Sequence, residues 1–137
     1  MMSFEEACSL CDEIMEFLLS CGGVYSSITP ETEGKILDCI VTNQFCIRRD
    51  GNGSIIHALF FWKVLKQDIA IILRGERPQE IHGGDTLFVI EHGSKSDHLR
   101  DIIKELRMIC GSNITGVFWN HKQQGYKLFM RQKGVRA

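Results

Sequence analysis

The sequence predicts a single mixed α/β domain whose helices and strands follow the order α-α-β-β-(?)-β-α-β-β. The chain has 137 residues, of which 44% are hydrophobic and 24% charged, as in an ordinary globular domain. Helical apolar spacing occurs near the start and near residue 100, whereas short apolar runs bounded by Gly, Asn and Asp fill the remainder. We therefore interpret residues 1–137 as one domain with a mixed sheet.

The first two elements are helices with clear start signals. Ser3-Phe4-Glu5-Glu6 is a capping box, and apolar residues recur behind it at helical spacing until Gly22-Gly23. A second helix is predicted to begin at Thr29, with Pro30 at its first position. Its apolar face comprises Ile36, Leu37, Ile40 and Val41.

A β-hairpin is predicted next, because Asp50-Gly51-Asn52-Gly53 separates the run 45–49 from the longer apolar run 55–65. From Arg48 onward this segment also matches R-x-x-G-x-G, a pattern that cradles the CoA pyrophosphate in many acetyltransferases. Such a motif must open a helix to direct several N–H groups at one anion, and here a strand follows. We therefore interpret these glycines as turn residues. The next run, 68–73, fits a short strand or a helical turn equally well.

The second half is predicted to hold three strands and one helix. A buried central strand covers 86–92, and an amphipathic helix covers 97–109. Two further strands, 114–119 and 126–131, follow with a short connection. The apolar face of the helix comprises Leu99, Ile102, Ile103, Leu106 and Ile109.

Charge and composition exclude several classes of protein. Lys and Arg number 16 and Asp and Glu 17, so no strong field is available to attract nucleic acid or an anionic membrane. The apolar runs are shorter than the ~20 residues that a membrane span needs. The acidic start lacks the basic region of a signal peptide, so we expect a cytoplasmic protein, and a homodimer stays open.

Six cysteines are present, and we expect free thiols rather than disulfides. Cys8 and Cys11 have C-x-x-C spacing, but they fall on a predicted helix, and no second pair follows at zinc-finger spacing. The sequence therefore predicts no metal site.

The segment after the central strand is the main candidate for chemistry. Glu91 ends the strand and is a candidate general base, with His92 beside it as a second catalytic candidate. The turn formed by Gly93, Ser94, Lys95 and Ser96 precedes a helix N-terminus, where free N–H groups and the helix dipole favour an anion. The same residues also fit an ordinary capped helix, with Ser94 and Asp97 as its capping pair.

The order of these pieces resembles the GNAT superfamily of acyltransferases, and its layout is most similar to the RTX-toxin-activating lysine acyltransferases. The resemblance runs from about residue 36 to 134. It is carried by Thr42-Asn43-Gln44-Phe45, Phe61-Trp62, His82-Gly83-Gly84-Asp85, the strand 87–91, Gly116-Val117-Phe118-Trp119-Asn120 and Arg131-Gln132-Lys133-Gly134.

Two departures limit what the resemblance implies. The toxin-activating family uses a catalytic His before its second helix, whereas the segment 24–29 here contains none. That family also has an Asp at the strand end, where this chain has Glu91. The resemblance thus implies the fold more firmly than toxin acylation, and compact GNAT-like proteins also occur in phages and prophages.

Two functions follow as expectations. In the first, an acetyl-CoA, another acyl-CoA or an acyl carrier protein donates an acyl group to a small-molecule or protein amine. Glu91 and His92 act as bases, and Asn120 and Tyr126 line the substrate cleft. In the second, a GNAT-like domain without catalysis works as a binding or assembly protein, because both the His and the helix-opening glycine motif are missing.

Overall fold

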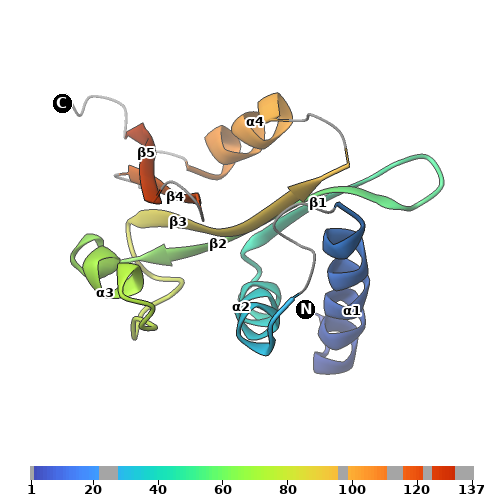
Figure 1. The fold of residues 1–137 in the computed structure, drawn as a ribbon, viewed down its shortest axis with the longest axis horizontal. Helices are drawn as coiled ribbons and strands as arrows, with labels where there is room; N and C mark the ends of the chain where they lie inside the picture. Colours follow the sequence, from blue (N-terminus) through green and yellow to red (C-terminus); the bar gives the residue numbers. More distant parts are fainter. Residues whose placement is uncertain (1, 22–27, 96–98, 111–115, 122–124, 132–137) are drawn as a thin grey trace.

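A five-stranded sheet forms the centre of the fold and has helices on both of its faces (Figure 1). The computed structural model describes residues 2–21, 28–95, 99–110, 116–121 and 125–131, and beyond residue 95 it describes side chains only at 104–109. The elements are α1 (Phe4–Cys21), α2 (Pro30–Val41), β1 (Phe45–Arg49), β2 (Ile55–Val64), η2 (Lys66–Asp68), α3 (Ile69–Leu73), β3 (Thr86–Ser94), α4 (Leu99–Cys110), β4 (Gly116–His121) and β5 (Gly125–Arg131).

The sheet is mixed, as the sequence predicts. Its strands lie in the order β1-β2-β3-β4-β5, and every neighbouring pair is antiparallel except β3 and β4, which are parallel. The chain passes from β3 to β4 through α4, because parallel neighbours need a crossover connection.

Both predicted helix starts are confirmed by their capping contacts. The Glu6 N–H donates to Ser3 Oγ, and the Ser3 N–H donates to Glu6 Oε1, each at 3.1 Å. The backbone hydrogen bond from Ser3 holds the pKa of the Glu6 carboxyl below its usual value. At α2, Thr29 Oγ1 accepts a hydrogen bond from the Thr32 N–H at 3.2 Å, and Pro30 follows the cap.

The predicted hairpin joins β1 to β2, so the interpretation of its glycines as turn residues is confirmed. Asp50 Oδ1 accepts hydrogen bonds from the N–H groups of Asn52 and Ser54 at 2.9 and 3.0 Å. Gly53 has a φ of 83°, a conformation that glycine adopts without a steric penalty. The ambiguous run after β2 is helical and forms η2 and α3.

Each face of the sheet has its own core. The larger core joins α1, α2 and α3 to the residues of β2 and β3 that face them, including Phe60, Trp62 and Phe88. The smaller core lies under α4, where fully buried Leu106 packs with the intervening residues of the same strands. Those residues are Leu59, Phe61, Leu87 and Val89.

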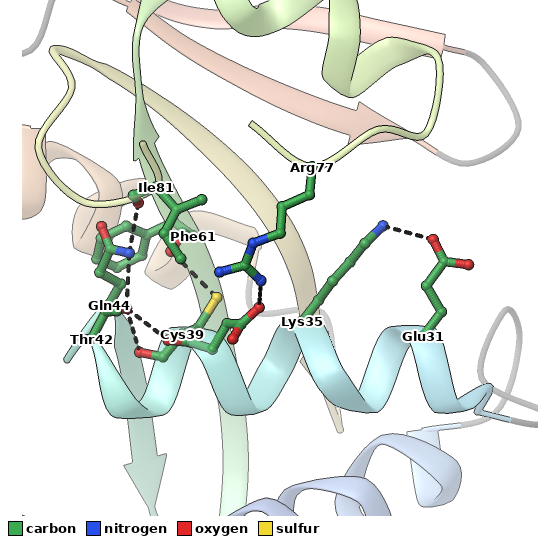
Figure 2. A network of polar contacts seen from close by, with 9 residues as sticks. Glu31, Lys35, Cys39, Thr42, Gln44, Phe61, Arg77 and Ile81 are labelled. Carbon is green, nitrogen blue, oxygen red and sulfur yellow. Dashed lines mark hydrogen bonds and ion pairs between the residues drawn. The ribbon is translucent and has the colours of Figure 1, made fainter. Parts of the chain in front are cut away.

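Buried Gln44 ties the start of the sheet to the segment that precedes β3 (Figure 2). Its Nε2 donates to Ile81 O at 2.8 Å and to Thr42 Oγ1 at 3.0 Å. Its Oε1 accepts from the Lys63 N–H at 3.1 Å. These bonds satisfy a buried amide and hold β2 in place next to Trp62.

Strand β3 is longer than the sequence predicts, since it continues to Ser94. Gly93 is therefore a strand residue, not a turn residue, and its place is explained by the close approach of α1. A Cβ at position 93 would lie 2.5 Å from Leu18 Cδ2. The glycine makes room for a helix against the sheet. From the sequence alone, a glycine with this role looks the same as a glycine in a turn.

Candidate functional site

Strands β3 and β4 separate part-way along their length. Their parallel pairing runs from Thr86 opposite Gly116 to Val89 opposite Trp119. Beyond that pair, β3 continues to Ser94 and β4 continues to His121 without further register between them. The pair thus opens at its C-terminal end, which is where α/β proteins commonly place ligands.

A β-bulge lies at the same point. On the other side of β3, Phe61 is opposite Val89 and Phe60 is opposite Glu91, so Ile90 is the extra residue. A bulge shifts the alternation of side chains by one position and re-aims the residues that follow. Here it directs Glu91, together with Phe60, onto the face covered by α1 and α2.

Glu91 and His92 therefore point to opposite faces of the sheet. His92 is opposite Leu59, which belongs to the core beneath α4. Adjacent strand residues alternate between faces, so the two predicted catalytic side chains do not converge on one substrate. The catalytic roles of Glu91 and His92 both stay predictions, and their opposite faces make Glu91 the one that borders the space on the side of α1 and α2.

Glu91 lines a cavity of about 600 Å³ between α2, α3 and the sheet, which we call the α2 cavity. Only 6% of the Glu91 surface is exposed. The floor beside this carboxylate is apolar and consists of Trp62, Phe88 and Ile90. The remaining lining residues are Pro30, Glu31, Thr32, Gly34, Lys35, Leu37, Asp38, Ile72, Gly75, Glu76 and Arg77.

The rim of the α2 cavity is charged. Lys35 Nζ lies 3.5 Å from Glu31 Oε1 one helical turn away, and Arg77 forms an ion pair with Asp38. Figure 2 shows Lys35 and Arg77 reaching into the space beside α2, Lys35 from the helix and Arg77 from the segment after α3. The Arg77 guanidinium also lies over the Trp62 ring, 5.8 Å from its centroid.

The predicted anion-binding turn is not a turn at its first two residues. Gly93 and Ser94 are paired with Ala58 and His57 of β2. The Lys95 N–H donates to Ile56 O at 3.2 Å, so this donor is engaged within the protein. Lys95 itself is exposed, and Ser96 lies outside the described residues. Phosphate binding at these positions stays a prediction, and the exposed Lys95 side chain is the group best placed for it.

Asn120 and Tyr126 are brought together by the sheet. They are register partners in the antiparallel pair of β4 and β5. Asn120 is also the first β4 residue beyond the last pair with β3, which puts its backbone at the opening between the strands. Their side chains lie outside the described part of the structure, so their role in a substrate cleft stays a prediction.

The described cysteines are poor candidates for a nucleophile. Cys8, Cys11, Cys21, Cys39 and Cys46 carry free thiols. Burial raises the pKa of Cys11 and of Cys46 to about 11, and it raises the pKa of the Cys39 thiol further. These three thiols are therefore protonated near neutral pH.

The described residues hold neither a metal-ligand cluster nor a membrane-spanning helix. Among them, no three His, Cys, Asp or Glu side chains are grouped so that they could bind a metal ion. None of the helices in the described ranges is both long and apolar enough to cross a membrane.

Sequence reasoning missed most of the α2 cavity. Glu31, Lys35 and Asp38 follow helical spacing on one side of α2, so their shared face could have been identified. Arg77 had no comparable signal, because its position depends on how the segment after α3 folds back over the sheet.

Comparison with known proteins supports the fold. No family model matches the chain, and no curated protein matches it. Among solved structures, it is similar to "GphF GNAT-like decarboxylase in complex with isobutyryl-CoA", with a TM-score of 0.56 and 14% sequence identity. The match covers 81% of this chain and 60% of that one, so the chain spans less than two thirds of the solved neighbour. The chain thus has a GNAT-like mixed α/β fold, as predicted, whereas the likeness to toxin-activating acyltransferases stays a prediction.

Proposed function

We propose that this protein binds an acyl-CoA, or a related acyl-pantetheine thioester, at the opening between β3 and β4 and transfers the acyl group to an amine. The observation that carries the proposal is the end of strand pairing at Val89 and Trp119, beside a bulge that aims a buried carboxylate into a cavity. The solved neighbour, described as a complex with isobutyryl-CoA, adds support from the same fold.

The opening suits the pantetheine arm of the donor. Pantetheine carries two amide groups, and amides pair with a strand edge as a neighbouring strand would. The β3 segment after Val89 offers such an edge toward β4, because its register with β4 has ended. The thioester would then lie near Ile90 and Glu91, next to the α2 cavity.

The chemistry needs one base and one oxyanion donor. Glu91 would take a proton from the ammonium form of the acceptor, and the resulting amine nitrogen would attack the thioester carbonyl carbon. A backbone N–H at the bulge would stabilise the oxyanion of the tetrahedral intermediate. The C–S bond then breaks, and the attacking nitrogen loses its extra proton to the departing thiolate, which gives an amide and a free thiol.

One observation favours a second function, an acyl-CoA or protein binding domain without catalysis. The predicted phosphate turn is partly engaged within the protein, since the Lys95 N–H donates to Ile56 O and Gly93 is paired with Ala58 of β2. A turn with fewer available N–H groups would hold the phosphates of a CoA donor less firmly. This favours a domain that binds a partner over an enzyme that turns over a CoA donor.

The two functions are separated by binding and thiol release measured on the same protein. Isothermal calorimetry would compare isobutyryl-CoA, acetyl-CoA, S-isobutyryl-pantetheine and ADP, of which ADP lacks the pantetheine arm. We expect both CoA thioesters and the pantetheine thioester to bind and ADP to bind much less. A thioester at a hundred times its Kd should also stabilise the fold by ~2.7 kcal/mol.

Transfer would be followed as free thiol released in the presence of primary amines. Thiol release that depends on the amine supports the transferase. Thioester binding without thiol release supports the binding domain, and it also fits decarboxylation, which leaves the thioester intact. Absence of binding by every pantetheine thioester would overturn the proposal.

A further inference from the structure

We propose that the α2 cavity binds a small primary amine whose body is aromatic or branched and apolar, and that Arg77 is a displaceable cation on the Trp62 face of that site. The role of this amine as acyl acceptor rests on the function proposed above. Its binding does not, because the α2 cavity and the opening between β3 and β4 are different places that meet at Ile90 and Glu91.

The size and floor of the α2 cavity fit the body of such an amine. A volume of about 600 Å³ lies within the range of small-molecule sites. Trp62, Phe88 and Ile90 present aromatic and aliphatic surface at the bottom. The Gly34 and Gly75 positions on the rim have open space where a side chain would otherwise stand.

The charge of the lining selects a cation. Four carboxylates line the α2 cavity against two basic groups, and three of the carboxylates are on its outer rim. Each basic group is already paired, Lys35 with Glu31 and Arg77 with Asp38. Glu91 is buried beside the aromatic floor, whereas the other three carboxylates are more exposed, so Glu91 is the acidic group that an entering ammonium would meet deepest in the cavity.

Arg77 indicates where a cation is stabilised. Its guanidinium lies 5.8 Å from the centroid of Trp62, and its side chain is 55% exposed. An exposed ion pair contributes little to stability, so Arg77 can leave the indole without a large cost. A ligand ammonium with an apolar body can take that place, because it gains the same attraction to the ring and buries more apolar surface.

Calorimetry in the absence of any thioester tests the inference. The probes are phenethylamine, 2-phenylethanol and phenylalanine, which share a phenyl group and differ in charge. We expect phenethylamine to bind at least tenfold more tightly than the neutral alcohol and the zwitterion. Equal binding of the alcohol would mean an apolar site without selection for a cation, and tighter binding of phenylalanine would mean a zwitterion site. Either result overturns the inference.

Two variants place the amine in the α2 cavity. Glu91→Gln should weaken phenethylamine binding at least tenfold, whereas Glu16→Gln, the same change on exposed α1 surface, should not alter it. Arg77→Ala should strengthen binding about three- to tenfold, since it removes the competing cation. Its control, Arg107→Ala, removes an exposed arginine of α4 on the other face.

The Arg77 variant keeps the test decisive if Glu91→Gln fails to fold. Unchanged affinity in Arg77→Ala, or an equal rise in Arg107→Ala, would overturn the role given to Arg77. Amine binding without thioester binding would leave this inference standing while the proposed transferase fails. Thioester binding and thiol release without selective amine binding would support the transferase and overturn this inference.

Discussion

The two faces of β3 are covered differently, although both are built from the same nine-residue strand. Beneath α4, Leu87 and Val89 pack closely with fully buried Leu106. On the opposite face, Phe88, Ile90 and Glu91 border the α2 cavity, where α2 and the segment after α3 stand away from the sheet. One face supplies stability, and the other combines stability with a space that a ligand can enter.

The bulge in β3, and not the order of residues alone, decides which of its side chains lie on the same face and can act together. Without the extra residue Ile90, alternation would place Glu91 on the same face as Leu87 and Val89. With it, Glu91 reaches the α2 cavity and His92 takes the face of α4. The expected effects of substitution therefore differ between neighbouring residues of one strand.

The largest expected effect separates Glu91 from His92. If acyl transfer occurs, Glu91→Gln should lower kcat about 10²- to 10⁴-fold, because it removes the base and preserves the volume of the side chain. His92→Gln, one residue along, should change kcat by less than about threefold, since its side chain lies on the other face. Steady-state kinetics on both variants, with circular dichroism to verify folding, provides the measurement. Equal losses in the two variants would contradict the assignment of faces.

The next effect concerns the core beneath α4. Leu106→Ala should lower the free energy of unfolding by ~2–5 kcal/mol, because it opens a cavity among Leu59, Phe61, Leu87 and Val89. Met108→Ala in the same helix should change it by less than ~0.5 kcal/mol, since Met108 is 79% exposed. Urea denaturation measures both variants. A small loss for Leu106→Ala would mean that α4 does not pack as described.

A third effect probes the contact between α1 and the opposite face. Gly93→Ala should cost ~1–3 kcal/mol, because its Cβ would lie 2.5 Å from Leu18 Cδ2 and force that buried side chain to move. The cost should be smaller in a Leu18→Ala background, where the opposing atoms are gone. A double-mutant cycle by urea denaturation measures this coupling. Additive costs would show that Gly93 does not accommodate α1.

The fold was largely predictable, because its signals are local. The capping box at Ser3, the Pro30 start of α2 and the hairpin at Asp50 each depend on residues close in sequence, and each is confirmed. The parallel placement of β3 and β4 follows from the intervening helix. The end of β3 was predicted too early, because Gly93 serves a contact with a helix some seventy-five positions earlier in the chain.

The candidate site was predictable only in part. Glu91 could be identified as the acid at the end of a buried strand, and it does line a cavity. Its separation from His92 depends on the bulge at Ile90, which has no signature in the residue pattern. The cation over Trp62 depends on the path of the segment around Arg77, which long-range packing determines.

The smallest expected effect concerns Lys95, an exposed residue that directly follows the C-terminal end of β3. If the phosphates of a CoA donor lie near it, Lys95→Glu should weaken isobutyryl-CoA binding about tenfold at low salt, because reversing one charge near a phosphate changes the interaction by roughly 1–2 kcal/mol. The difference should largely vanish at 0.5 M salt, where the screening length is only a few ångströms. Lys66→Glu, at an exposed lysine outside β3, is the control for net charge and should leave the affinity for isobutyryl-CoA nearly unchanged.

S-isobutyryl-pantetheine, which has no phosphate, should bind wild type and Lys95→Glu equally well. A loss of affinity shared by the pantetheine thioester would mean that position 95 acts on the strand edge itself. A loss for neither ligand would place the phosphates away from the end of β3, and the proposed donor would then be held by its pantetheine arm alone.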